Sequence, residues 1–363
     1  MKPKIVVVGC GVVGALIAYE LSAQLDADIQ VVDQQMLPAQ GSTAAALGVL
    51  MGVISHKVKG RTWRLREFSA RRYRGLIDEL SQQGQAVPFN SQGIVSLCFD
   101  QAKLPKWETL RAKRLAQGWP LEIWSVAELA ARCPQVALGE VKAAIYSPAD
   151  GQVDPAALTR SLITVAASRG VKFCWDAAVT RLQVAGRRCV GVQTTHGAFE
   201  ADWVVLSAGL GSGPLTAFAS EPLVLMPVLG QAMEIQLPSV LGEMAFQPVI
   251  NGDDIQLVPL GEGRYWLGAT VEFPEAGVPL AAEAMGLENL QKGAARFCEA
   301  IASAKIVRTW SGLRPRPVGQ PAPVIKPLGK LENVTLATGH YRNGVLLAPA
   351  TAQQVCEQLQ TAL

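Results

Sequence analysis

The chain has few of the residues that build metal centres or disulfide frameworks. Its 363 residues include only three histidines, His56, His196 and His340, and no two of them lie at a ligand spacing. The seven cysteines are scattered, odd in number and never arranged as Cys-x-x-Cys. This pattern predicts reduced thiols in a cytoplasmic protein and no metal site.

A strong excess of charge is also missing. Lysine and arginine total 33 against 30 acidic residues, for a formal net charge of +3, which argues against a nucleic-acid partner. The one locally basic stretch, residues 61–74, is expected to be the solvent-exposed face of a helix. No segment reads as a membrane span, which needs about 18 uninterrupted apolar residues. With 49% hydrophobic residues, the chain can bury a large core and is not disordered.

The N-terminus carries a nucleotide-binding pattern. Residues 4–8 read as a buried strand, residues 12–25 as a helix and residues 29–32 as a second strand. The intervening G-x-G-x-x-G turn permits a tight bend, close approach of a pyrophosphate and close helix–strand packing, and the helix N-terminus attracts phosphate. Asp33 ends the second strand, where a carboxylate can accept hydrogen bonds from a ribose hydroxyl. The residues of the turn assigned to the cofactor are Gly9, Gly11, Val12, Val13 and Gly14.

This fingerprint alone does not separate FAD from NAD. The next segment, residues 41–48, is rich in small and hydroxyl residues that could line a pyrophosphate and the edge of a flavin. Ser42, Thr43 and Gly48 are the candidates there, and their place in the chain favours FAD.

The remaining pattern predicts two domains of an α/β protein with an α+β insert. A long helix is expected at 62–82, strands near 92–99, 171–175, 188–195 and 203–206, mostly strands over 222–272, a helical region over 279–304, a strand at 334–337 and a final helix from about 349. Nucleotide-type signals at both ends predict a Rossmann-type FAD-binding domain formed by residues 1–85, 140–220 and 305–363. A mixed β-sheet substrate domain would then comprise residues 86–139 and 221–304.

At this point the sequence resembles the D-amino-acid-oxidase-like flavoenzymes, and within them the glycine oxidases of thiamine biosynthesis. Besides the N-terminal segments, the resemblance is carried by Asp-Gly-Gln-Val-Asp-Pro at 150–155 and by residues 201–209, which end in Ser-Ala-Gly. It is most specific in Trp-Ser-Gly-Leu-Arg-Pro at 310–315, in Ala-Thr-Gly-His-Tyr-Arg-Asn-Gly at 337–344 and in residues 346–351. The match runs over nearly the whole chain.

The resemblance implies non-covalent FAD and oxidation of a small amine or amino acid to an imine, which water hydrolyses. It also implies dioxygen as acceptor and hydrogen peroxide as product. Arg314 would pair with the substrate carboxylate, and Arg342 would lie on the flavin side of the same pocket. Arg316 is expected to point away. The cofactor set implied in addition comprises Val179, Ala208, Gly209, Gly339, Arg342, Asn343, Gly344 and Val345.

The chain departs from this family at two positions. Gln256 stands where glycine oxidases carry an active-site tyrosine, and Leu229 stands where an arginine often precedes Gly-Gln. We assign Gln256 to the catalytic set with Arg314 and Arg342, and the identity of the amine stays open. Tyr265 and Tyr341 could each supply the missing phenol, although Tyr265 also fits a core position. His340 reads as a packed residue rather than a base.

Two alternatives remain open from the sequence. One is a dehydrogenase on the same fold that passes electrons to a quinone or a carrier protein. The other is a flavin-binding subunit without turnover of its own, which the residues at 229 and 256 keep open. A homo-oligomer is compatible with the sequence, which does not specify the oligomeric state.

Overall fold

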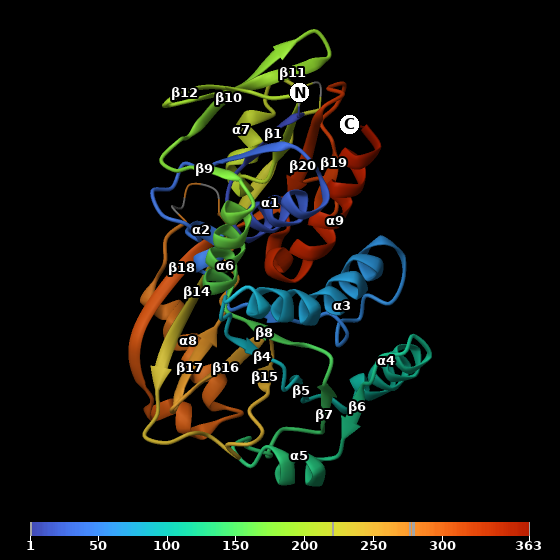
Figure 1. Ribbon diagram of the computed structural model, residues 1–363. Coiled ribbons are helices and arrows are strands. Elements are labelled where there is room, and N and C mark those ends of the chain that lie inside the picture. Colours follow the sequence, from blue (N-terminus) through green and yellow to red (C-terminus); the bar gives the residue numbers. More distant parts are fainter. Residues whose placement is uncertain (1, 220, 276, 278–279, 363) are drawn as a thin grey trace.

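A computed structural model describes residues 2–219, 221–275, 277 and 280–362 (Figure 1). Its upper part in the figure is a six-stranded sheet with the order β19-β20-β13-β1-β2-β9. All neighbours are parallel except β19 and β20. The strands are β1 (Lys4–Val8), β2 (Asp28–Val32), β9 (Lys172–Cys174), β13 (Trp203–Leu206), β19 (Val324–Pro327) and β20 (Val334–Thr338).

Helices bury one face of this sheet. One core cluster joins β1 and β2 to α1, α3, α6 and α9, and a second cluster fills the opposite face. Residues 12–21 of α1 are all buried, because α1 is packed by α6 and α9 as well as by the sheet. The helices are α1 (Val12–Gln24), α3 (Gly60–Gln82), α6 (Pro155–Ser168), α7 (Ser212–Leu215) and α9 (Gly344–Ala362).

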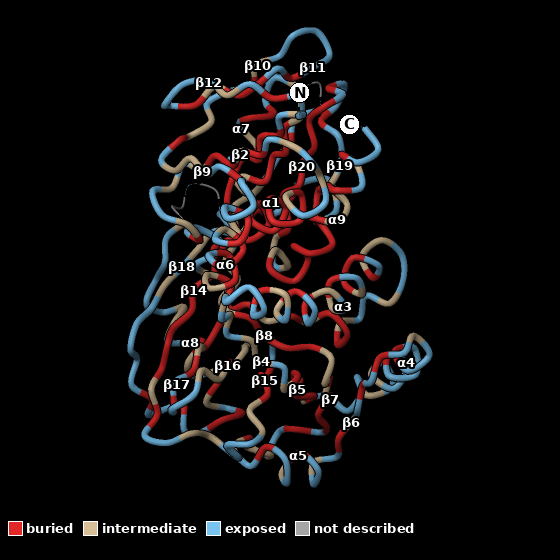
Figure 2. The backbone as a smooth tube through the Cα atoms, viewed as in Figure 1, coloured by how far each residue is buried: buried red, intermediate tan, exposed pale blue. Residues whose placement is uncertain are grey.

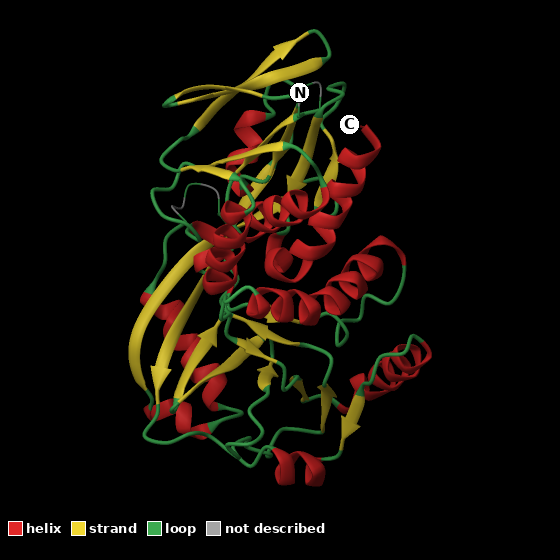
Figure 3. Ribbon diagram, in the orientation of Figure 1, coloured by secondary structure: helices red, strands yellow, loops and turns green. Residues whose placement is uncertain are grey.

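The lower part is an eight-stranded sheet with the order β18-β14-β17-β16-β15-β5-β7-β6. Figure 3 shows most of its strands below α3, with helices against the strands and at the periphery. The strands are β5 (Ile94–Cys98), β6 (Glu122–Trp124), β7 (Ala143–Ser147), β14 (Leu225–Gln236), β15 (Val249–Gly252), β16 (Ile255–Gly261), β17 (Arg264–Gly268) and β18 (Lys305–Pro317). The accompanying helices are α4 (Leu104–Ala116), α5 (Val126–Arg132) and α8 (Ala284–Ala295).

Two three-stranded sheets complete the fold. β10-β11-β12 lies at the top of Figure 1, and β3-β8-β4 lies near α3, between the two large sheets. Their strands are β10 (Val179–Ala185), β11 (Arg188–Thr194), β12 (Gly197–Glu200), β3 (Val49–Leu50), β8 (Gly151–Val153) and β4 (Phe89–Asn90). The short helices are α2 (Gly41–Ala44) and the 3-10 turns η1 (Gln101–Lys103), η2 (Gly209–Gly211), η3 (Glu299–Ser303) and η4 (Tyr341–Asn343).

This architecture confirms the predicted fold class, and the strands at 4–8 and 203–206 form within the predicted bounds. The predicted domain ranges remain a prediction, with one difference in strand membership. β7 and β18 pair within the eight-stranded sheet, although their residues were assigned to the FAD-binding domain. No described helix is long and apolar enough to cross a membrane.

β18 was not predicted as a strand, because its sequence contains Pro315 and Pro317. It lies at the edge of the sheet and pairs only with β14, so each proline can face the side without a ladder partner. Figure 2 shows that much of this outer strand is exposed. Its conformation matters because Arg314 is part of it.

The last helix begins earlier than predicted. We expected it to start near Pro349, but α9 starts at Gly344 and encloses this proline. A proline inside a helix lacks the N–H that would bond to the carbonyl four residues before it, here Val345. The Tyr73 hydroxyl of α3 donates to that Val345 carbonyl, so the group is satisfied from a neighbouring helix.

Candidate active site

The glycine turn after β1 is required by packing. Gly9 has φ +94°, and a Cβ there would lie 2.6 Å from the Ala208 Cα at the end of β13. A Cβ on Gly14 would lie 1.9 Å from the Gly9 carbonyl oxygen. The first and third glycines therefore let β1, α1 and β13 meet closely, as the motif predicts.

The second glycine lies beside the open end of α1. A Cβ on Gly11 would lie 2.9 Å from Thr43 Oγ1, and this hydroxyl accepts the Val12 N–H at 3.0 Å. No acceptor within the described part of the chain takes the N–H groups of Val13 and Gly14. These two donors, with the helix dipole, suit the pyrophosphate of a dinucleotide.

Asp33 closes the same turn. Its carboxylate accepts the Cys10 N–H at 2.5 Å and the Gln35 N–H at 2.8 Å. Each carboxylate oxygen keeps a lone pair for a ribose hydroxyl. Its carbonyl accepts the Ala177 N–H, two residues before Val179 begins β10.

Several other residues of the predicted cofactor set already have partners in the protein. Ser42 donates to the Leu313 carbonyl at 2.6 Å. Cβ atoms on Gly48 and Gly339 would collide with the Val153 carbonyl at 1.8 Å and with Pro317 at 2.8 Å. By contrast, nothing lies within 4 Å of a Cβ on Gly209, and on Gly344 the nearest atom is 3.7 Å away. Space beside the backbone is therefore open at Gly209, whereas Gly344 has a neighbour there at an ordinary van der Waals distance.

Arg314 lies flat against the sheet. A Cβ on Gly230 would lie 2.1–2.3 Å from its guanidinium, so only glycine fits beneath it. Its Nη1 donates to the Leu229 carbonyl at 2.9 Å. Burial and the neighbouring Arg342 lower the pKa of Arg314. The two cations are thus close together, and a substrate carboxylate would relieve their repulsion.

Arg342 and Tyr341 come from the loop before α9. Arg342 Nη2 lies 3.6 Å from the Asp254 carboxylate, which is 81% exposed and so a weak counter-ion. Tyr341 adopts φ +55° and is close enough to Arg314 to affect its pKa. Tyr341 thus lies beside Arg314, whereas the Tyr265 hydroxyl accepts the Leu241 N–H within the core.

Strand register places Gln256 on the same sheet face as Arg314. Gln256 pairs with Gly268, Gly268 with Ala232, and Ala232 with Trp310, which is four residues from Arg314 on the same strand. Cβ atoms on Gly268 and Gly312 would contact Leu47 and Ala45, so small residues make room for the segment after α2. Gln256 Nε2 lies 3.8 Å from Met51 Sδ.

Two expectations about neighbouring side chains, Arg316 and His340, have clear outcomes. Arg316 does not point away, since its guanidinium carbon lies 5.8 Å from the Tyr341 ring and 5.1 Å from the Phe273 ring. Residues two apart on a strand share a face, which the expectation overlooked. The same alternation puts the Leu229 side chain on the face opposite Arg314. His340 is packed as predicted, buried and bonded to Thr351.

The basic stretch 61–74 is not uniformly solvent-exposed. Arg66 is only 8% exposed, and its Nη2 donates to Asn343 Oδ1 at 2.9 Å. The sequence pattern had placed this residue on the exposed face and had not singled it out. The available signal was its spacing from Ser69 and Tyr73, which places all three on one helix face.

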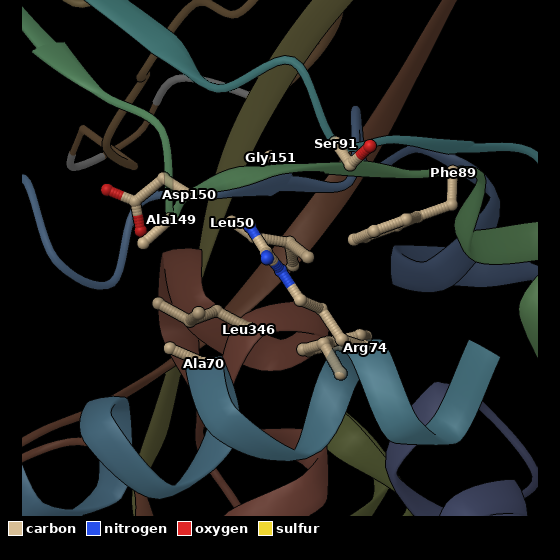
Figure 4. Close-up of a pocket in the computed structure, with 10 residues that line it drawn as sticks. Leu50, Ala70, Arg74, Phe89, Ser91, Ala149, Asp150, Gly151 and Leu346 are labelled. Atoms are coloured by element: carbon tan, nitrogen blue, oxygen red, sulfur yellow. The ribbon is translucent and has the colours of Figure 1, made fainter. Parts of the chain in front are cut away.

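Other features of the described residues do not compete for this role. No group of metal-ligating side chains is found among them. Figure 4 shows a small pocket beside α3 and β8, lined by residues including Ala70, Arg74, Asp150 and Leu346. Neither Arg314, Arg342 nor Gln256 lines it, so it is separate from the candidate site.

Comparison with known proteins identifies the family. Residues 4–358 match the family described as FAD dependent oxidoreductase. The chain belongs to this family. It is therefore an FAD-dependent oxidoreductase, and the turn formed by residues 9–14 has the donors and the close packing that this cofactor requires.

Individual relatives agree with this assignment. Glycine oxidase of Pseudomonas putida is 29% identical over 367 residues, covering 100% of this chain and 96% of that protein. The bifunctional protein ThiO/ThiG of Nostoc sp. is 29% identical over 364 residues, but the chain spans only 52% of its length. The crystal structure of glycine oxidase from Geobacillus kaustophilus superposes with a TM-score of 0.88 at 25% identity, covering 99% of this chain and 95% of that one.

Proposed function

We propose that this flavoenzyme oxidises a small amino acid at its α-carbon and uses dioxygen as electron acceptor. The observation that carries the proposal is the proximity of Arg314 in β18 to Arg342 in η4, where Asp254 beside Arg342 is exposed and Glu272 is near Arg314. An anionic substrate would complete this arrangement. Similarity to proteins named glycine oxidase supports a small substrate.

In this proposal the protein binds and orients, and FAD when bound supplies the hydride acceptor. Arg314 offers a planar fork of N–H donors, which suits a carboxylate better than a point charge does. It is held by the Leu229 carbonyl and by the surface of Gly230, so its orientation is set before the substrate arrives. This preorganisation brings the substrate α-carbon to one place.

The residues expected to hold FAD are those at the glycine turn, Asp33, and the backbone near Gly209 and Gly344. The overall change is loss of two electrons and two protons from the α-carbon and nitrogen, which gives an imine. Water then releases ammonia and a 2-oxo acid. Two electrons and two protons convert dioxygen to hydrogen peroxide.

Gln256 is expected to contact the substrate amine or side chain in place of a phenol. Its amide both donates and accepts, and it lies beside the Met51 thioether. Trp310 and Trp266 pack edge to face on the same sheet face, with ring centroids 5.9 Å apart. These bulky rings limit the space, which favours small side chains on the substrate.

The test is an anaerobic titration of the purified yellow protein with a panel of amines, in which the flavin absorbance is measured after each addition. Small amino acids should bleach the flavin, and air should restore it with release of peroxide. Arg314→Ala should weaken amino-acid binding by about 2 kcal/mol or more, roughly 30-fold, because a desolvated carboxylate loses its partner.

A matched control is Arg264→Ala, an exposed arginine at the start of β17 in the same sheet. It should titrate like the parent protein. The assignment of Arg314 to the substrate carboxylate is wrong if Arg314→Ala leaves the affinity for amino acids unchanged. Flavin that amino acids reduce but dioxygen reoxidises only slowly would favour a dehydrogenase, and failure of every amine to bleach the flavin would refute amine oxidation.

A further inference from the structure

One face of α3 docks the beginning of α9 through polar groups. Ser69 Oγ accepts the Ala350 N–H at 3.3 Å, and the Tyr73 hydroxyl donates to the Val345 carbonyl. Arg66 occupies the same face one turn earlier and reaches Asn343. α3 therefore determines where the loop of residues 341–344 lies.

Arg66 bridges that loop to a second one. Its Nη1 donates to the Met51 carbonyl at 2.7 Å, while its Nη2 donates to Asn343 Oδ1 at 2.9 Å. The side chain is buried, and its Nε–H has no acceptor in the described part of the chain. Burying a cation with an unused donor costs free energy, so packing alone does not explain an arginine at position 66.

The Met51 end of the bridge is rigidly anchored. The buried Asp150 carboxylate accepts the N–H groups of the three following residues, 52–54, at 2.7–2.8 Å. Arg114 donates to carbonyls of residues 53, 55 and 57. Arg66 thus extends from a fixed loop, which contacts Gln256 through Met51, to the loop that carries Asn343.

The bridge also determines which way the Asn343 amide faces. A guanidinium only donates hydrogen bonds, so the Asn343 oxygen must point toward Arg66. The amide N–H groups then point to the other side, and at the next residue, Gly344, an added Cβ would meet nothing closer than the His340 Cβ at 3.7 Å. We propose that Arg66 is a positioning residue that orients Asn343 as a hydrogen-bond donor toward FAD.

This inference rests on the FAD-dependent family and not on the proposed substrate. It is tested by the dissociation constant of FAD and by the visible spectrum of bound flavin, both without any amine. Arg66→Met should raise the FAD dissociation constant about tenfold and shift the spectrum, because the amide can rotate. Arg64→Met, an exposed arginine on the same helix, should do neither.

Asn343→Asp makes the test specific. The new carboxylate can pair with Arg66, so the melting temperature should stay the same. Because a carboxylate cannot donate a hydrogen bond to FAD, the affinity for FAD should fall about tenfold. Because this change is on the loop and leaves α3 intact, it remains informative if Arg66→Met does not fold. The double variant Arg66→Met/Asn343→Ala should bind FAD no more weakly than the Asn343→Ala variant.

Three results would overturn the proposal. One is parental FAD affinity and spectrum in Arg66→Met, and another is parental FAD affinity in Asn343→Asp. The third is a double variant whose FAD dissociation constant rises by the product of the two factors seen in the single variants. Such independent effects would exclude action of Arg66 through Asn343. Failure of amine oxidation would change none of these measurements.

Discussion

At the scale of single residues, His340 shows how burial fixes a protonation state. Thr351 Oγ1 donates its one proton to the Leu347 carbonyl, so it must accept from His340 Nε2, 2.8 Å away. The imidazole is therefore neutral with its proton on Nε2. Burial, with a smaller effect of Arg61, lowers its pKa from an ordinary value of 6.5 to about 3.

This shift makes the stability of the protein depend on pH. Below about pH 6.5 the unfolded chain binds a proton that folded His340 excludes, so stability falls as the pH drops from 6.5 toward 3. The loss attributable to this group should reach about 2 kcal/mol at pH 5. Urea midpoints at pH 5 and pH 7.5 measure it, and His340→Gln should flatten the difference. An equal pH dependence in both proteins would contradict the assignment.

The sequence was informative about residues whose role depends on backbone geometry. Gly9, Gly14 and Asp33 were identified because a tight turn and a strand end leave a readable spacing. Arg66 and Met51 were not, since their importance comes from contacts with residues 277 and 205 positions away. Such contacts leave no local pattern in a single sequence.

At the scale of elements, α9 depends on a neighbour for one of its backbone groups. Tyr73→Phe would leave the Val345 carbonyl buried without a donor and should destabilise the protein by about 1–3 kcal/mol. Chemical denaturation measures this loss. Tyr146→Phe is the control, because its half-buried hydroxyl makes only a 3.2 Å bond to Gln92. Equal losses in the two variants would show that the carbonyl does not need Tyr73.

The elements were predicted where their periodicity was clear and missed where tertiary context decided. α3 and β13 follow from their apolar pattern, and they form close to the predicted bounds. β18 and the start of α9 contain prolines, which normally end such elements. β18 tolerates its prolines because it lies at the edge of the sheet, and α9 tolerates Pro349 because a hydroxyl from α3 satisfies the free carbonyl. Neither of these tertiary contacts can be predicted from the local sequence.

At the scale of the whole molecule, FAD should act as a structural component. Its proposed contacts come from segments near residues 9–14, 33, 209 and 344, which are far apart in the chain. FAD at 100 times its dissociation constant should therefore stabilise the folded state by about 2.7 kcal/mol through mass action. Thermal unfolding of the apoprotein with increasing FAD measures the effect.

FMN is the matched control for that experiment, because it carries the flavin ring but lacks the adenosine half. If the glycine turn and Asp33 bind the adenosine end, FMN should raise the melting temperature far less than FAD. Equal stabilisation by both would contradict the assignment of Asp33 to the ribose.

The order of strands in the six-stranded sheet also determines when this sheet can be completed during synthesis on the ribosome. β1 is translated about two hundred residues before its neighbour β13, and β20 must wait for residues 334–338. The nascent chain cannot complete this sheet before residue 338 has been translated. Binding of FAD to the complete sheet must therefore await β20, and a chain terminated before residue 334 should emerge colourless.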